Sequence, residues 1–228
     1  MALQRAKLIG VVDLVFCIDN SRSMITCIEG VKNNISSFTE SLSTSNPQLK
    51  IDFRIGFCLY GQKKYNILKF TDNTQEFKLQ LESVRKSREN EFTPGAIDFC
   101  ISDFDWRMDC NKFMIVFTDE ALSKGYSDNY KEDKGAAYFE NLNDKIVSNR
   151  INLFYYGSEC PYYEQFNKIP RGRYSNMRFG TSLDFSDLLK DLGKTVSRSI
   201  DTGIQFRNNV DLKKMIYKQD GVNINYLN

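Results

Sequence analysis

Oxygen-bearing side chains follow an apolar run near the start of the chain, at a spacing that suits a metal ion. The run ends at Asp19, and Ser21 and Ser23 follow at alternate positions. Two further oxygen donors lie later in the chain: Thr93 stands before a proline, and Asp119 follows another apolar run. Hard divalent cations prefer such oxygen ligands, and Mg²⁺ often keeps part of its water shell. These five residues are therefore candidate metal ligands.

Strand-like and helix-like segments alternate along the chain. Continuous apolar runs are typical of parallel strands covered on both faces. Apolar residues that recur with a period of two indicate a half-buried strand, and a period of 3.6 indicates a helix. The predicted strands are residues 11–18, 51–59, 65–71, 113–118 and 151–156, the third of them antiparallel at an edge. The predicted helices are residues 25–42, 77–84, 94–101, 137–146 and 185–196. This order predicts an α/β fold: a doubly wound, mostly parallel central sheet with one antiparallel edge strand and helices on both faces.

The predicted elements bring the candidate ligands to one edge of the sheet. Ligands of open α/β sheets bind beyond the carboxyl ends of the strands. Asp19 and Asp119 both fall at such ends, and Thr93 lies in a loop that precedes a helix. We therefore expect these side chains to meet.

The Asp-x-Ser-x-Ser run, followed by Thr93 in Phe-Thr-Pro-Gly and Asp119 in Val-Phe-Thr-Asp, resembles the metal-ion-dependent adhesion site of von Willebrand factor type A domains. The resemblance implies Mg²⁺ or Mn²⁺ held by Ser21, Ser23 and Thr93, with Asp19 and Asp119 as direct or water-mediated ligands. Neutral hydroxyls leave the cation with positive charge and an open position. An Asp or Glu carboxylate of a partner protein would supply both the ligand and the charge.

The resemblance covers most of the chain and implies a von Willebrand A domain over residues 1–200, followed by a C-terminal extension over residues 201–228. It also implies a non-enzymatic interaction module that acts as an adaptor in a multiprotein system, with a bacterial stress or defence assembly as one analogy. In members of the family that switch, the last helix moves, here residues 183–199. Three positions depart from the family pattern: Arg22, Glu91 and Glu120, of which the two glutamates can add charge near the cation.

Composition excludes several classes of function. The sequence contains no histidine, which rules out Ser-His-Asp catalysis, histidine-ligated zinc and a histidine pH switch. A formal charge of +2 gives no reason to expect nucleic acid or an anionic membrane as a partner. Six cysteines without a C-x-x-C pair favour a reducing compartment, and no apolar run is long enough to cross a bilayer. We expect a cytoplasmic protein, and a basic cluster at residues 168–178 is interpreted as a surface loop.

Other interpretations of the same residues remain open. Ser21, Ser23 and Thr93 could cap helices, since serine and threonine are favoured at helix N-termini. An aspartate after an apolar strand also begins haloacid-dehalogenase-like Mg²⁺-dependent phosphotransferases or hydrolases, but Ser21 stands where they need a second aspartate. A metal-free scaffold of the same fold is the third alternative.

Overall fold

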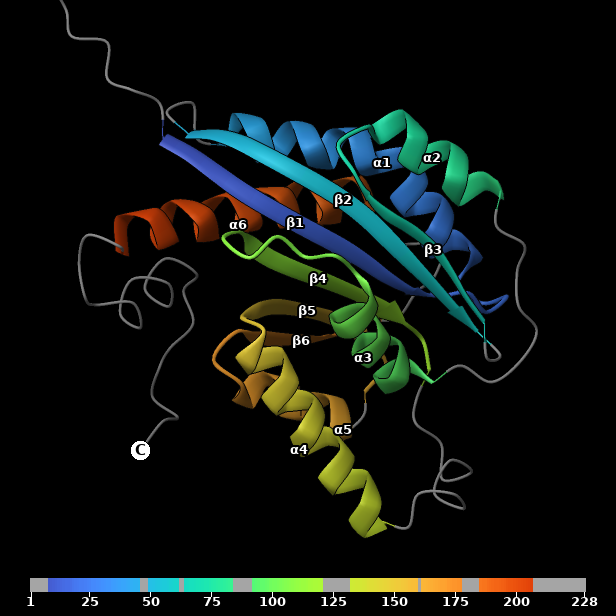
Figure 1. Cartoon of the computed structure of the whole chain (residues 1–228). Coiled ribbons are helices and arrows are strands. Elements are labelled where there is room, and N and C mark those ends of the chain that lie inside the picture. The colour runs from blue at the N-terminus through green and yellow to red at the C-terminus, as the bar shows by residue number, and fades with distance from the viewer. Residues whose placement is uncertain are drawn as a thin grey trace, which may run out of the picture.

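The computed structural model describes residues 8–45, 49–61, 64–83, 92–120, 132–159, 161–177 and 185–206. Its centre is a six-stranded sheet in the order β3-β2-β1-β4-β5-β6 (Figure 1). The strands are β1 (Leu8–Asp19), β2 (Leu49–Gly61), β3 (Lys64–Thr71), β4 (Asn111–Thr118), β5 (Ile151–Gly157) and β6 (Gly172–Asn176). All neighbours pair in parallel except β2 with β3. The predicted fold class is confirmed.

Helices cover both faces of the sheet, as Figure 1 shows. They are α1 (Ile25–Thr44), α2 (Thr74–Ser83), α3 (Thr93–Asp103), α4 (Glu132–Ser148), α5 (Pro161–Glu164) and α6 (Phe185–Phe206), with a 3₁₀ turn η2 (Gln165–Lys168). Apolar residues of α1, α2 and α6 form one core with one face of the sheet, and those of α3, α4 and η2 form the other. In the described part of the chain, none of the helices is long and apolar enough to span a membrane.

Two features of the carboxyl-terminal half differ from the sequence-based expectation. The edge strand β6 was not predicted, and Arg173 of the basic cluster lies in it. Helix α6 continues to Phe206, so residues 201–206 of the expected C-terminal extension are helical. Residues 207–228 lie outside the described residues, as does Glu91.

Close contact between α1 and α6 depends on two glycines. A β-carbon at Gly30 of α1 would lie 2.4 Å from the ring of Phe185 in α6. A β-carbon at Gly193 of α6 would lie 2.8 Å from the carbonyl oxygen of Phe38 in α1. Larger residues here would force the helices apart, because contacts this short require a neighbour to move.

On one face of β1, successive side chains differ in chemical character from one end of the strand to the other. Side chains two residues apart point to the same face of a strand, and parallel pairing places β2 residues beside them. The register partners are Asp13 with Arg54, Val15 with Gly56, Cys17 with Cys58 and Asp19 with Tyr60. An ion pair, an apolar layer, a thiol pair and the candidate site therefore follow one another along this face.

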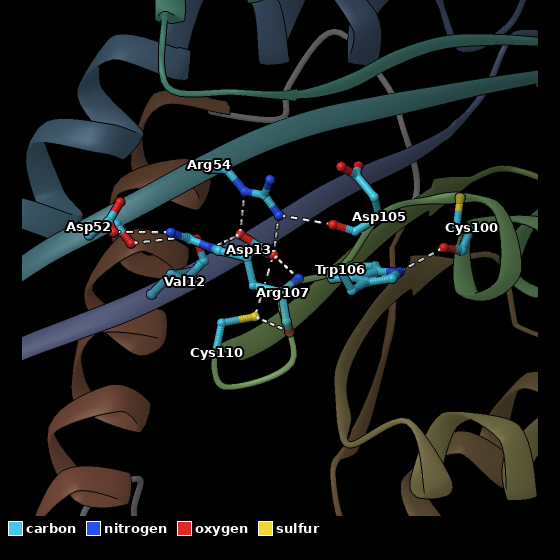
Figure 2. A network of polar contacts seen from close by, with 9 residues as sticks. All are labelled: Val12, Asp13, Asp52, Arg54, Cys100, Asp105, Trp106, Arg107 and Cys110. Carbon is cyan, nitrogen blue, oxygen red and sulfur yellow. Dashed lines mark hydrogen bonds and ion pairs between the residues drawn. The ribbon is translucent and has the colours of Figure 1, made fainter.

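Asp13 is fully buried and is held by two arginines. Arg54 donates from Nε to Oδ1 at 2.9 Å and from Nη2 to Oδ2 at 2.7 Å. Arg107 donates its backbone N–H to Oδ2 at 2.7 Å and its Nε–H to Oδ1 at 2.8 Å, so that both guanidinium groups converge on one carboxylate (Figure 2). Burial raises the pKa of Asp13, but these hydrogen bonds and charges outweigh it and leave the pKa below its ordinary value.

The same arginines fasten the segment between α3 and β4 to the sheet. Arg54 also donates to the carbonyl oxygen of Asp105 at 3.0 Å, and Arg107 donates to the carbonyl oxygen of Val12 at 2.7 Å. Trp106 donates its indole N–H to the carbonyl oxygen of Cys100 at 2.9 Å (Figure 2). These hydrogen bonds thus hold residues 105–107, between α3 and β4, against β1 and β2.

We predict that Asp13→Asn destabilises the fold by about 3 kcal/mol, because it removes the buried charge on which two partly buried arginines converge. The matched control is Asp52→Asn, since Asp52 also pairs with Arg107, at 3.0 Å, but its side chain is 54% exposed. An exposed pair contributes about 0–1 kcal/mol. Urea unfolding measures both variants, and equal losses would contradict this account of Asp13.

Candidate functional site

Strands β1 and β4 bring Asp19 to the same sheet edge as the end of β4. Ile18 pairs with Phe117 in the parallel register, so Asp19 lies beside Thr118. The buried carboxylate of Asp19 accepts hydrogen bonds from the Thr118 hydroxyl at 3.0 Å and from the Ser21 backbone N–H at 2.7 Å. These two donors fix the orientation of the carboxylate.

The two serines of the run do not cap the following helix. Helix α1 begins at Ile25, and Met24 in the N-cap position makes no side-chain capping hydrogen bond. The hydroxyls of Ser21 and Ser23 lie instead 3.0 Å from each other. The capping interpretation is therefore wrong for these serines, and their oxygens stand together at the end of β1.

Thr93 is the first residue of α3, and its hydroxyl is buried in a chain of hydrogen bonds. The hydroxyl donates to Oε2 of Glu120 at 2.8 Å and lies 2.7 Å from the Tyr60 hydroxyl. A hydroxyl has one proton and two lone pairs, so when Glu120 is ionised and accepts the Thr93 proton, Tyr60 is the donor to Thr93. One lone pair of the Thr93 oxygen then remains for another partner. The helix N-cap is Phe92, so capping does not explain Thr93 either.

Acidic groups gather where these elements meet. Burial raises the pKa of Asp19 to about 6, partly offset by the hydrogen bonds from Ser21 and Thr118, and the charge of Asp119 raises it further. Burial also raises the pKa of Glu120 to about 7, against the hydrogen bonds from Thr93, and the charges of Asp19 and Asp119 add to the rise. The three carboxyl groups therefore act on one another within a single small region.

This donor set fits a hard divalent cation. It offers carboxylate and hydroxyl oxygens, which Mg²⁺ and Mn²⁺ prefer, and it concentrates negative charge that a cation would neutralise. Asp19, Ser21, Ser23, Thr93 and Asp119 would hold the ion, directly or through water. Glu120 belongs to the same region through its hydrogen bond to Thr93.

Other residues that shape the site carry little sequence signal. Thr118 and Tyr60 orient Asp19 and Thr93, yet each occupies an ordinary strand position. Ser158, after β5, donates to the carbonyl oxygen of Asp119 at 2.8 Å and so holds the end of β4. Arg22, which departs from the family pattern beside the two serines, is exposed.

Comparison with known proteins places this fold in a defined group. The family model described as von Willebrand factor type A domain matches residues 13–194. No curated protein sequence matches the chain at the level expected of a relative.

Three solved structures share the fold at low sequence identity. The VWA domain of SpRpn10 has a TM-score of 0.56 at 14% identity, over 78% of this chain and 93% of that one. The conserved hypothetical protein BatB from Bacteroides thetaiotaomicron has a TM-score of 0.55 at 16% identity, over 82% and 98%. Proximal thread matrix protein 1 from the mussel byssus, with a zinc-occupied MIDAS motif, has a TM-score of 0.57 at 15% identity, over 82% and 46%.

The raised pKa values of Asp19 and Glu120 predict how stability depends on pH in a chelator. Unfolded carboxyls titrate near pH 4, so between about pH 4 and pH 7 the folded state binds more protons and stability falls as pH rises. Thermal unfolding in EDTA should therefore show a melting temperature that decreases from about pH 5 to pH 8. Added Mg²⁺ should raise it most at pH 8.

The variant Glu120→Gln measures how much Glu120 contributes to this pH dependence of stability. The amide keeps the size of the side chain and does not titrate, so the pH-dependent loss should shrink by on the order of 3 kcal/mol. An unchanged pH dependence in Glu120→Gln would show that Glu120 does not have the raised pKa on which this prediction rests.

Proposed function

The chain belongs to the von Willebrand factor type A domain family, and on that premise we propose that it binds an acidic side chain of a partner protein through a divalent cation. Domains of this family are generally protein-interaction modules without catalytic activity. The cation, Mg²⁺ or Mn²⁺, is held by Asp19, Ser21, Ser23, Thr93 and Asp119. A related fold is described as having a zinc-occupied MIDAS motif, which supports a divalent ion at this position of the fold.

The observation that carries the proposal is that Glu120, which accepts the hydroxyl of Thr93, lies within reach of the charges of Asp19 and Asp119, while Asp19 accepts a hydrogen bond from Ser21. The hydroxyls of Ser21 and Ser23 adjoin each other without capping α1. Thr93 keeps one lone pair of its oxygen after its bonds to Tyr60 and Glu120. Neither arrangement serves the fold in an evident way, and both suit metal ligation.

The open coordination positions of the cation determine what kind of partner group the site can bind. Asp19 and Asp119 together neutralise a divalent cation, and the hydroxyl ligands are neutral. An incoming carboxylate can then add a strong oxygen ligand at a cation that still has open coordination positions. An acidic side chain is therefore the partner group we propose.

Glu120 changes this balance because it brings a third carboxylate from the same chain. Its Oε2 atom already lies 2.8 Å from a ligand oxygen, that of Thr93. With a divalent cation bound, three carboxylates leave a net charge of −1, which opposes a further carboxylate. We expect Glu120 to compete with the partner, so that it must withdraw when the partner binds.

The cellular setting that we propose is a cytoplasmic multiprotein assembly in which this chain is an adaptor. The described cysteines, Cys17, Cys27, Cys58, Cys100 and Cys110, are free thiols, as is usual in a reducing compartment. A bacterial stress or defence system is one such assembly. The absence of histidine and the serine at position 21 argue against hydrolase or phosphotransferase chemistry.

The proposal predicts metal-dependent retention of a partner. Wild type and the double variant Asp19→Ala/Ser21→Ala are used to capture proteins from native extract, each with Mg²⁺ and with EDTA. We expect a protein retained only by wild type in Mg²⁺. Equal retention in all four samples would leave a metal-free scaffold, and turnover of an aryl phosphate would favour an enzyme.

A second prediction concerns Glu120. Glu120→Gln should bind the captured partner at least about tenfold more tightly in Mg²⁺, a gain of about 1.4 kcal/mol, because a competing charge is removed. The matched control is Glu76→Gln, since Glu76 also accepts a threonine hydroxyl, that of Thr71 at 2.6 Å, but on the exposed surface of α2. Weaker binding by Glu120→Gln would show that Glu120 assists the partner instead.

A further inference from the structure

Three buried thiols converge one layer below the candidate site. Cys17 of β1 and Cys58 of β2 are register partners on one face of the sheet, and Cys100 of α3 packs onto them. All three are 0% exposed, and their sulfur atoms lie within 4.8 Å of one another. Among the described residues, no other group of three or more cysteine or acidic side chains has its ligand atoms this close together.

The geometry of the cluster is close to that of three sulfurs around a single ion. Metal–sulfur bonds of about 2.3 Å place three sulfurs about 4 Å apart in a planar triangle. Closing the present spacing requires side-chain shifts of under about 1 Å. The three thiols come from three different elements, so a bound ion would link β1, β2 and α3.

The surroundings decide which ions fit. The three thiols lie in an apolar core, with Ala96 and Ile97 of α3 in the same buried cluster. The carboxyl groups whose charges act on these thiols are Asp19, which acts on Cys17, and Asp103, which acts on Cys58. Both charges are negative and disfavour additional thiolates. Burial raises the pKa of Cys17 and Cys100, whereas hydrogen bonds from those two thiols lower the pKa of Cys58.

Net charge is energetically costly in a buried, apolar environment. The ion should therefore displace as many thiol protons as it carries positive charges. A monovalent soft cation such as Cu(I) replaces one proton and leaves one thiolate and two thiols around it. Trivalent arsenic fits equally: As(OH)₃ and three thiols give As(SR)₃ and three waters, with no change in oxidation state. Structural zinc almost always takes four ligands, and this cluster offers three.

We propose that Cys17, Cys58 and Cys100 form a binding site for a soft, thiophilic ion held by three sulfur ligands, separate from the oxygen site at the sheet edge. Soft thiolate ligands select such ions, whereas the hard oxygen donors above them select Mg²⁺ or Mn²⁺. Cysteine is also buried as an ordinary apolar core residue. A measurement of ion binding distinguishes a metal site from simple core packing.

The test titrates the reduced, full-length protein without oxygen, in one arm with Cu(I) delivered from a coloured competing chelator and in the other with arsenite. X-ray absorption of the loaded wild type counts the sulfur neighbours and needs no variant. We expect one tightly bound ion with three sulfur neighbours in at least one arm. Binding of Cu(I) alone identifies a monovalent site, and binding of arsenite alone identifies a trivalent one.

Variants then assign the sulfurs. Cys58→Ala and Cys100→Ala should each lose the three-sulfur site, with circular dichroism to verify folding. The matched control is Cys27→Ala, because Cys27 is an equally buried free thiol on the opposite face of the sheet, and it should bind like wild type. The proposal is overturned if neither ion binds to wild type, if the ion has fewer than three sulfur neighbours, or if Cys58→Ala binds unchanged.

Discussion

Repulsion among acidic groups at one edge of the sheet is the constraint on which the rest of the site depends. Asp19, Asp119 and Glu120 lie in one partly buried region, and burial alone already opposes the ionisation of Asp19 and Glu120. Such groups bind protons or a cation, because unpaired negative charge is costly away from water. Every neighbouring hydrogen bond can be understood as holding these oxygens in place against that repulsion.

The fold supplies the positions in a simple way. Parallel pairing of β1 with β4 aligns Ile18 with Phe117 and so delivers both strand ends to one edge. Pairing of β1 with β2 puts Tyr60 beside Asp19, and the Tyr60 hydroxyl reaches Thr93 at the start of α3. Strands β1 and β2 and helix α3 also bring the three thiols together, two residues before Asp19 along β1. Hard and soft donors are thus stacked on one face because β1 alternates with a period of two.

The sequence was sufficient to predict five of the six strands of the sheet and to place Asp19 and Asp119 at strand ends. Apolar runs ending in Asp19 and Asp119 predicted the strand ends, and sheet geometry then predicted that these residues would meet. Strand β6 was missed because Gly172–Asn176 is polar and only partly buried at an edge, so it lacks the alternation that marks a strand. Whether the five predicted residues bind metal stays a prediction.

Contacts between distant residues explain the other differences. Asp13 interrupts an apolar strand, and its partner Arg107 lies 94 residues away, so no local pattern announces the pair. Tyr60 and Thr118 gain their roles only from the neighbours that the fold gives them. From the sequence alone, serine hydroxyls after a strand are also compatible with helix capping, and the start of α1 at Ile25 decides against it.

An anomalous difference map from crystals grown in Mn²⁺ tests the metal site at this sheet edge. We expect a peak bounded by the hydroxyls of Ser21, Ser23 and Thr93, with Asp19 and Asp119 in contact directly or through water. The absence of a peak at saturating Mn²⁺, with Glu120 still bonded to Thr93, would contradict this expectation and show that this edge holds protons in place of a cation.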